Sequence, residues 1–155
     1  MKYDISALGN ALVDTQYMVD YEFLESIGLE ADSMTLASAE EQAPIIKKLI
    51  DMGSESVSDC GGSATNSLIA ASNYGSKCHH VCRVSDDADG KKYLESLRSA
   101  GVDHIGVSSK ESDMPTGKCL ILVTPDAKRT MSSMLGVSAF LATSDIKFDV
   151  IDDSK

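Results

Sequence analysis

Two adjacent glycines directly precede an apolar run in the stretch DCGGSATNSLIAASNYG, residues 59–75. A glycine pair permits positive φ and lets a ligand approach the backbone closely. The helix start that we expect after it presents unpaired N–H groups and a partial positive charge. Asn66 can donate and accept hydrogen bonds, which suits a neutral hydroxyl better than an anion. Gly61, Gly62 and Asn66 are therefore candidate binding residues, although a glycine pair also marks many plain tight turns.

Two familiar phosphate-binding loops are absent around the glycine pair. The loop GxxxxGK[ST] needs a lysine beside its glycines, and the first lysine after Gly62 is Lys77. The dinucleotide loop GxGxxG is also missing, which argues against an oxidoreductase.

The sequence CHHVC at 78–82 contains residue types that can bind a metal ion. On a strand, Cys78, His80 and Cys82 would share one face, and His79 would point to the other. No second ligand pair stands at zinc-finger spacing, so we predict a buried or half-buried strand and no metal site. The chain has four cysteines, which we expect to be reduced thiols of a cytoplasmic protein.

Size and charge exclude several classes of protein. A chain of 155 residues can form one domain with a substantial core. The net charge of −10 argues against non-specific nucleic-acid binding, which requires a basic surface. The sequence has no apolar run of membrane-spanning length, and the N-terminal MKYDISALGN is typical of a first strand, not of a signal peptide.

Strand-like and helix-like segments alternate along most of the chain, which indicates a parallel βαβ sheet with flanking helices. The segment 37–53 is the clearest helix, because Ser38 and Glu41 can form a capping box and Gly53 follows its end. An extended stretch at 11–19 and a hairpin around the PDAK turn break the alternation, and they predict a small second β-layer. Further strands are expected at 3–9, 54–59, 77–85 and 103–109, and further helices at 21–29, from the glycine pair to about Tyr74, and at 86–101.

Four stretches in a fixed order are more specific than any single motif. They are LGNALVD at 8–14, GGSATNSLIAASNYG at 61–75, CRVSDDADGKKYLESLRSAGVD at 82–103 and PTGKCLILVTPDAKRTM at 115–131. Together they resemble the PfkB or ribokinase-like family of carbohydrate kinases, and most of all adenosine kinase and its sugar-kinase relatives. The resemblance covers essentially the whole chain. It implies a ribokinase-like α/β fold with a parallel sheet, flanking helices and a small β-sheet lid.

The resemblance also implies roles for particular residues. In such kinases the aspartate of the opening GN-x-x-x-D holds sugar hydroxyls, which here is Asp14 with Asn10 beside it. The glycine pair Gly61–Gly62 and the asparagine Asn66 also line the sugar site. A carboxylate accepts two hydroxyl protons and an asparagine supplies mixed donors and acceptors, so the chemistry agrees with these roles.

The family lid would be formed here by segments of about 11–19 and 115–134. It would close over the sugar and exclude water. Arg129, on the second of these segments, could reach a substrate or a phosphate. A solvated arginine on a strand is the simpler interpretation.

The resemblance places the catalytic base and the site for ATP and Mg²⁺ in a motif of the type D-T-x-G-A-G-D, in a C-terminal half. We find no match, because Gly106, Gly117 and Gly136 are the only glycines after residue 101 and none lies in such a setting. We therefore expect residues 1–155 to be the N-terminal part of one ribokinase-like domain. It would bind substrate but lack the catalytic base and the ATP site.

Two alternatives remain open at the level of sequence. One is a sugar- or nucleoside-binding module that does not transfer phosphate. The other is a non-catalytic interaction module, in which the lid or an exposed sheet edge forms a homodimer. The sequence does not distinguish adenosine, ribose, fructose and ketodeoxygluconate-like acids as the substrate.

Overall fold

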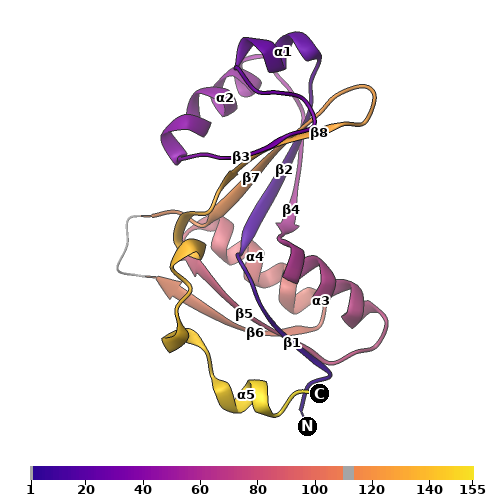
Figure 1. Cartoon of the computed structure of the whole chain (residues 1–155), viewed down its shortest axis with the longest axis vertical. Helices are drawn as coiled ribbons and strands as arrows, with labels where there is room; N and C mark the ends of the chain where they lie inside the picture. The colour runs from indigo at the N-terminus through magenta and orange to yellow at the C-terminus, as the bar shows by residue number, and fades with distance from the viewer. Residues whose placement is uncertain (1, 110–113) are drawn as a thin grey trace. The chain divides into compact units, whose positions relative to one another are not determined.

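The computed structural model describes residues 2–109 and 114–155 of the chain. They divide into two compact units, each with its own sheet and apolar cluster (Figure 1). Unit 1 comprises Met1–Val13, Cys60–Gly117 and Leu135–Lys155, and unit 2 comprises Asp14–Asp59 and Lys118–Met134.

Unit 1 contains a parallel three-stranded sheet in the order β1–β5–β6, formed by Ile5–Leu8, Cys78–Ser85 and Val102–Ser109. The helices α3 (Ser63–Asn73) and α4 (Ala88–Ser99) lie on one face of this sheet (Figure 1). Gly75 and Gly101, just beyond the ends of these helices, have positive φ, as expected for glycines that end helices. The alternation of strands and helices predicted for this part of the chain is confirmed.

The end of unit 1 is a segment of short helices: η1 (Gly136–Phe140), η2 (Thr143–Asp145) and α5 (Phe148–Asp152). Arg83 on β5 binds this segment to the sheet, because its Nη2 lies 2.9 Å from both carboxylate oxygens of Asp145. Both side chains are largely shielded from solvent, which makes such a two-oxygen contact stronger than a surface ion pair.

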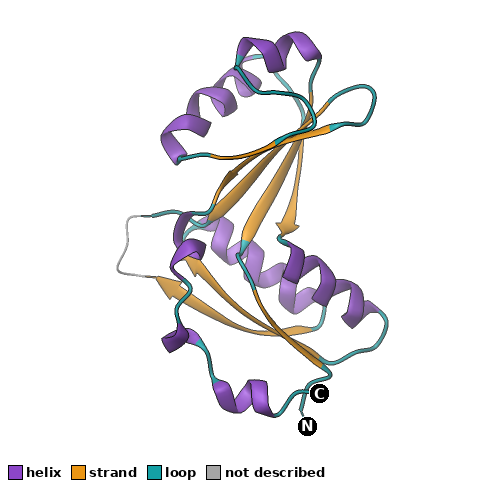
Figure 2. Cartoon of the chain, viewed as in Figure 1, coloured by secondary structure: helices purple, strands orange, loops and turns teal. Residues whose placement is uncertain are grey.

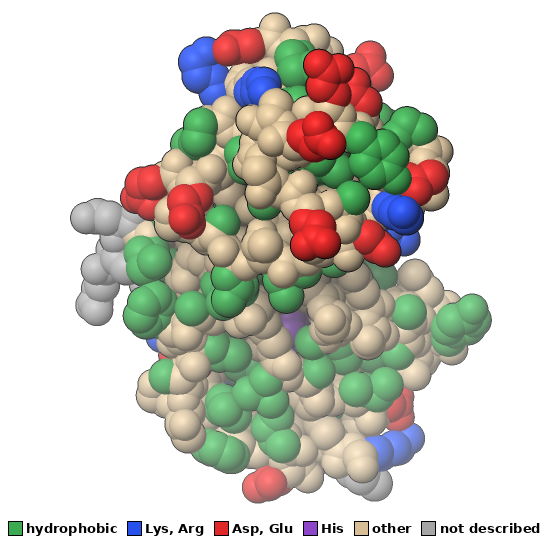
Figure 3. Space-filling view, turned by 45° about the horizontal axis from the view of Figure 1, so that its top comes forward, with side chains coloured by type: hydrophobic (Ala, Val, Ile, Leu, Met, Phe, Trp, Pro, Cys, Tyr) green, Lys and Arg blue, Asp and Glu red, His purple; other side chains and the backbone are tan. Residues whose placement is uncertain are grey.

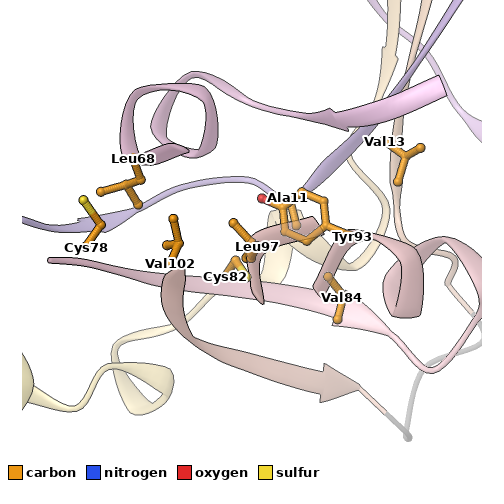
Figure 4. Packing of buried hydrophobic residues seen from close by; sticks show 9 residues of the cluster. All are labelled: Ala11, Val13, Leu68, Cys78, Cys82, Val84, Tyr93, Leu97 and Val102. Carbon is orange, nitrogen blue, oxygen red and sulfur yellow. The ribbon is translucent and has the colours of Figure 1, made fainter. Parts of the chain in front are cut away.

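The apolar cluster of unit 1 packs α3 and α4 against the sheet (Figure 4). Its buried members are Ala11, Val13, Leu68, Cys78, Cys82, Val84, Tyr93, Leu97 and Val102. The side-chain alternation predicted for CHHVC is confirmed, since Cys78 and Cys82 join this cluster while His79 faces away toward Ser6 and Tyr3. Burial of each large aliphatic side chain stabilises the fold by about 1.5–3 kcal/mol.

Unit 2 contains a five-stranded sheet in the order β3–β8–β7–β2–β4. In that order its strands are Met34–Leu36, Arg129–Met134, Gly117–Val123, Leu12–Met18 and Ser56–Gly61. Helices α1 (Tyr21–Ser26) and α2 (Ala39–Asp51) pack against this sheet (Figure 2). Its apolar cluster joins sheet and helix residues, namely Tyr17, Phe23, Leu24, Leu49, Leu120 and Leu122.

Local patterns in unit 2 are confirmed where the sequence predicts them. Ser38 and Glu41 form the capping box at the start of α2, with Glu41 N–H donating to Ser38 Oγ at 3.2 Å. The helix continues through Pro44, which neither begins nor ends it. The predicted hairpin is the antiparallel pair β7–β8, whose turn is closed by a hydrogen bond of 3.1 Å from Thr124 N to Lys128 O.

Strand β3 is not predicted by any pattern in the sequence. Its three residues are all exposed and show no inward alternation, so they carry no periodic signal. The sequence ESDMPTG at 111–117 predicts a turn-rich link, and its residues 111–113 lie outside the described residues. Within residues 2–109 and 114–155, no helix has both the length and the apolar character needed to cross a bilayer.

Candidate functional site

The glycine pair forms a tight turn into α3, as the residue types suggest. Gly62 stands at the N-cap position of α3. Its φ of 101° and ψ of 137° are accessible to glycine but strained for other residues. A Cβ atom built on Gly62 would lie 2.6 Å from the carbonyl oxygen of Asn10. One on Gly9 would lie 2.7 Å from the Cβ of Ala64. The segment Gly9–Asn10 therefore packs directly against the glycine turn and the first turn of α3.

The start of α3 has hydrogen-bonding groups that the protein leaves open. No side chain of a described residue caps this helix, and its backbone bonds begin with Asn66 N, which donates to Gly62 O at 2.9 Å. The side chains of Asn10 and Asn66 are exposed, and neither makes a hydrogen bond to any described residue. These amides and the open N–H groups are neutral donors and acceptors, which match the hydroxyl groups of a polyol.

Asp14 lies on β2 in unit 2, where it is half-buried. Burial raises the pKa of its carboxyl group, and the nearby charge of Asp59 raises that pKa further. A contact of 3.4 Å between Thr15 Oγ1 and Ser58 Oγ joins the two strands that carry these aspartates. A ligand hydroxyl that donates to Asp14 would replace part of the hydration that burial removes. Asp59 was not predicted from the sequence, because the pairing of β2 with β4 brings together residues far apart in the chain.

Arg129 is exposed at the start of β8, and its position pairs with Val123 on β7. The carbonyl of Val123 accepts a hydrogen bond of 3.0 Å from Val19 N. Val19 follows Asp14 by five residues, a distance of about 16 Å along an extended strand. The structure therefore does not bring Arg129 beside Asp14, and a role for Arg129 in binding stays a prediction.

Comparison with known proteins identifies the family. Residues 23–153 match the family described as pfkB family carbohydrate kinase. The chain belongs to the pfkB carbohydrate kinase family. Its fold is the ribokinase-like α/β fold, as the order of the four sequence stretches predicted.

Three known proteins show how much of a family member this chain covers. Ribokinase of Mus musculus is 29% identical over 89 residues, which are 56% of this chain and 27% of that protein. The adenosine kinase of Sinorhizobium meliloti matches with a TM-score of 0.83 and 29% identity over 100% of this chain and 46% of its own. The Anopheles gambiae adenosine kinase, solved with P1,P4-di(adenosine-5) tetraphosphate, has a TM-score of 0.85 at 23% identity over 97% of this chain and 46% of its own. The chain thus spans less than half the length of these relatives.

A kinase of the pfkB family is expected to bind ATP and Mg²⁺. The described residues of this chain do not form a site that suits either of them. The open groups around Gly62 are neutral, and most of the acidic side chains visible in Figure 3 gather on the upper part of that view. Within the part of the chain that the structure describes, no group of three or more His, Cys, Asp or Glu side chains could hold a metal ion. A triphosphate chain requires cations or a dedicated anion site, so we assign neither group to residues of this chain.

Two polar clusters behind the site were also not predicted from the sequence. One joins Thr65, His80 and Tyr93 beneath α3. The other joins Asp87 and Thr116 at the start of α4. The alternation on β5 predicted that His80 faces inward, but no local pattern identified its partners.

Proposed function

We propose that this chain carries the substrate-binding part of an ATP-dependent pfkB-family kinase that phosphorylates a hydroxyl group of a sugar or nucleoside. The observation that carries the proposal is the glycine turn at Gly62, which Asn10 contacts and no side chain caps. Family membership supplies the reaction class, and the open neutral groups fit a substrate rich in hydroxyls.

Each candidate residue has a defined role in this proposal. Gly61 and Gly62 let the substrate lie against the backbone, where the open N–H groups of α3 can bind its oxygens. Asn10 and Asn66 donate to and accept from hydroxyl groups. Asp14 accepts hydroxyl protons, as the family resemblance implies. The segments 11–19 and 115–134, which contain β2, β7 and β8, are proposed to form the β-sheet lid of the family.

The phosphate donor is proposed to be ATP with Mg²⁺, bound by groups that we do not assign to residues 1–155. The Anopheles gambiae relative, solved with a diadenosine tetraphosphate, is consistent with this donor class. The purified chain should accordingly bind substrate without phosphorylating it. Steady phosphate transfer from ATP to a sugar or nucleoside by this chain alone would contradict the assignment.

Substrate binding can be tested by thermal unfolding of the chain with adenosine, ribose, fructose and ketodeoxygluconate. A ligand that binds only the folded state stabilises it by about 2.7 kcal/mol at a concentration of 100 times its Kd, so one class should raise the unfolding temperature. Asp14→Ala should lose this rise. Asp51→Ala is the matched control, because Asp51 is an exposed aspartate of unit 2 in a surface ion pair with Lys47. A rise that survives Asp14→Ala would remove Asp14 from the site.

A second function, self-association, has its own support in unit 2. The edge strands β3 and β4 expose Met34, Leu36 and Val57, residues that are 59%, 68% and 70% accessible. Apolar side chains on an open strand edge favour pairing with another strand. If the chain is an interaction module, sedimentation should show a dimer that ligands do not change and that Leu36→Lys dissociates.

A further inference from the structure

A buried polar cluster lies beneath the first turn of α3, within the apolar cluster of unit 1. Thr65, His80 and Tyr93 come from α3, β5 and α4, and each is 0% exposed. Nε2 of His80 lies 3.2 Å from Thr65 Oγ1 and 3.3 Å from the Tyr93 hydroxyl oxygen, and the two hydroxyl groups are also hydrogen-bonded to each other. Figure 4 shows the Tyr93 ring among the apolar side chains of this cluster.

The surroundings of the His80 ring define which of its nitrogens donates and which accepts. Nδ1 of His80 lies 3.1 Å from the carbonyl oxygen of Ala7, which can only accept, so Nδ1 carries a proton. Burial lowers the pKa of His80, so the ring is neutral and Nε2 is an acceptor. One of the two hydroxyl groups must donate to Nε2 and the other must donate to the first. The cluster therefore joins β1, β5, α3 and α4 through hydrogen bonds.

This cluster touches the candidate site through Thr65. A Cβ atom on Gly62 would lie 3.4 Å from Thr65 Oγ1 and 2.6 Å from the carbonyl oxygen of Asn10. The glycine turn thus lies between the Thr65 hydroxyl on one side and the Asn10 backbone on the other. A rotation of the Thr65 side chain would change the space available to Gly62, and with it the position of the first N–H groups of α3.

We propose that Thr65, His80 and Tyr93 are positioning residues, which hold the glycine turn and the start of α3 in the geometry that binds the substrate. The effect on substrate binding rests on the proposed function. The effect of the three residues on the geometry of the turn does not depend on it. The hydroxyl of Thr65, not its bulk, is the contact on which the arrangement depends.

The test compares Thr65→Val, which keeps the shape but loses the hydroxyl, with Thr65→Ser, which keeps the hydroxyl, and with Tyr93→Phe. Ser72→Ala is the matched control: it removes the bond from Ser72 Oγ to Ala100 O at the other end of the same helix. Amide hydrogen exchange at Asn66, whose N–H is the first of α3 with a backbone acceptor, is the first measurement, made in the ligand-free chain. The nitrogen NMR signals of the His80 ring, which report its tautomer, are the second. Affinity for adenosine and for ribose is the third.

Thr65→Val and Tyr93→Phe should speed exchange at Asn66 about tenfold and change the His80 signals, whereas Thr65→Ser should leave both as in the wild type. The probe that binds the wild type should bind these two variants about tenfold more weakly, and should bind Thr65→Ser and Ser72→Ala as before. Exchange that rises equally along all of α3, or equally in Ser72→Ala, overturns the inference. If the wild type binds neither probe, that result contradicts the proposed function instead. The amide exchange and the His80 ring signals would then decide whether the three residues hold the turn in place.

Discussion

Two helices of unit 1 begin in opposite ways. The start of α4 is satisfied by the protein itself: Asp87 accepts from Gly90 N at 2.7 Å, from Thr116 N at 2.8 Å and from Thr116 Oγ1 at 2.7 Å. The start of α3 follows Gly62 and has no side-chain cap. Both turns are crowded, because a Cβ on Gly62 would meet the carbonyl oxygen of Asn10 and one on Gly90 that of Ser85.

This difference shows which helix start can bind a ligand. An N–H group that already donates to an acceptor within the protein adds little to the binding free energy of a ligand. One hydrogen bond would only be exchanged for another, which is nearly neutral in free energy. At α3 a ligand oxygen would supply an acceptor that the protein does not. Close backbone packing is thus common to both turns, and the missing cap is the feature for which we propose α3 as the binding turn.

The largest effect is expected for Gly62→Ala. Strain at a φ of 101° together with the clash against Asn10 should lower the free energy of unfolding by about 2–5 kcal/mol. Gly75→Ala is the matched control at the other end of α3, because φ is 93° there and no atom lies within 4 Å of the added Cβ. It should cost only the strain, about 1–2 kcal/mol. Urea unfolding of both variants measures the difference, and equal losses would show that the packing against Asn10 is unimportant.

Asp87→Ala should have the next largest effect. It removes the cap of α4 and leaves the buried Thr116 without its acceptor, which should lower the free energy of unfolding by about 2–3 kcal/mol. Asp20→Ala is the comparison, because that cap of α1 accepts one hydrogen bond, from Phe23 N, and should cost about 1 kcal/mol. Asp87→Ala should keep the ligand-induced rise in unfolding temperature. Loss of that rise would mean that the two helix starts are not functionally distinct.

Sequence patterns predicted those features that depend on neighbours along the chain. The capping box of Ser38 and Glu41 and the alternation in CHHVC each lie within five residues, and the structure has both. The glycine turn into α3 was also evident from residue types. The fold class was predicted from the order of the four family stretches and not from any one of them. The residues of a single element do not determine how a sheet is assembled.

Features that depend on tertiary contacts could not be predicted. Thr65 and Tyr93 are 28 residues apart, and the bond between Asp87 and Thr116 spans 29. No periodicity relates such pairs, since helix and strand patterns show which face is buried but not which polar group it meets. The absence of a cap at α3 became visible only in the structure, because Ser63 beside Gly62 is itself a residue type that often caps helices.

A fall in pH should affect the two helix starts differently. Burial lowers the pKa values of His79, His80 and His104, so the folded state holds fewer protons than the unfolded state below about pH 6.5. Stability is therefore complete above that pH and falls as the pH drops through it, by a total on the order of 1 kcal/mol between about pH 7 and 5.5. Of the two starts, only that of α3 is bonded to a histidine through its first turn. Hydrogen exchange, corrected for its intrinsic pH dependence, should rise more at Asn66 than at Lys91, the amides that make the first backbone bonds of α3 and α4. A stability that stays constant over this pH range would contradict the assignment.

The smallest expected effect comes from giving α3 the carboxylate that it lacks. Ser63→Asp places a negative charge in the first turn of an uncapped helix, which should stabilise the chain by about 0.3–1 kcal/mol. Ala88→Asp is the matched change on α4, and it should gain less, because Asp87 and Asp89 already serve that helix start. The carboxylate introduced by Ser63→Asp would compete with a ligand oxygen for the open N–H groups, so this variant should show a smaller ligand-induced rise in unfolding temperature. A stabilised variant that binds its ligand as tightly as the wild type would show that the substrate does not use these N–H groups.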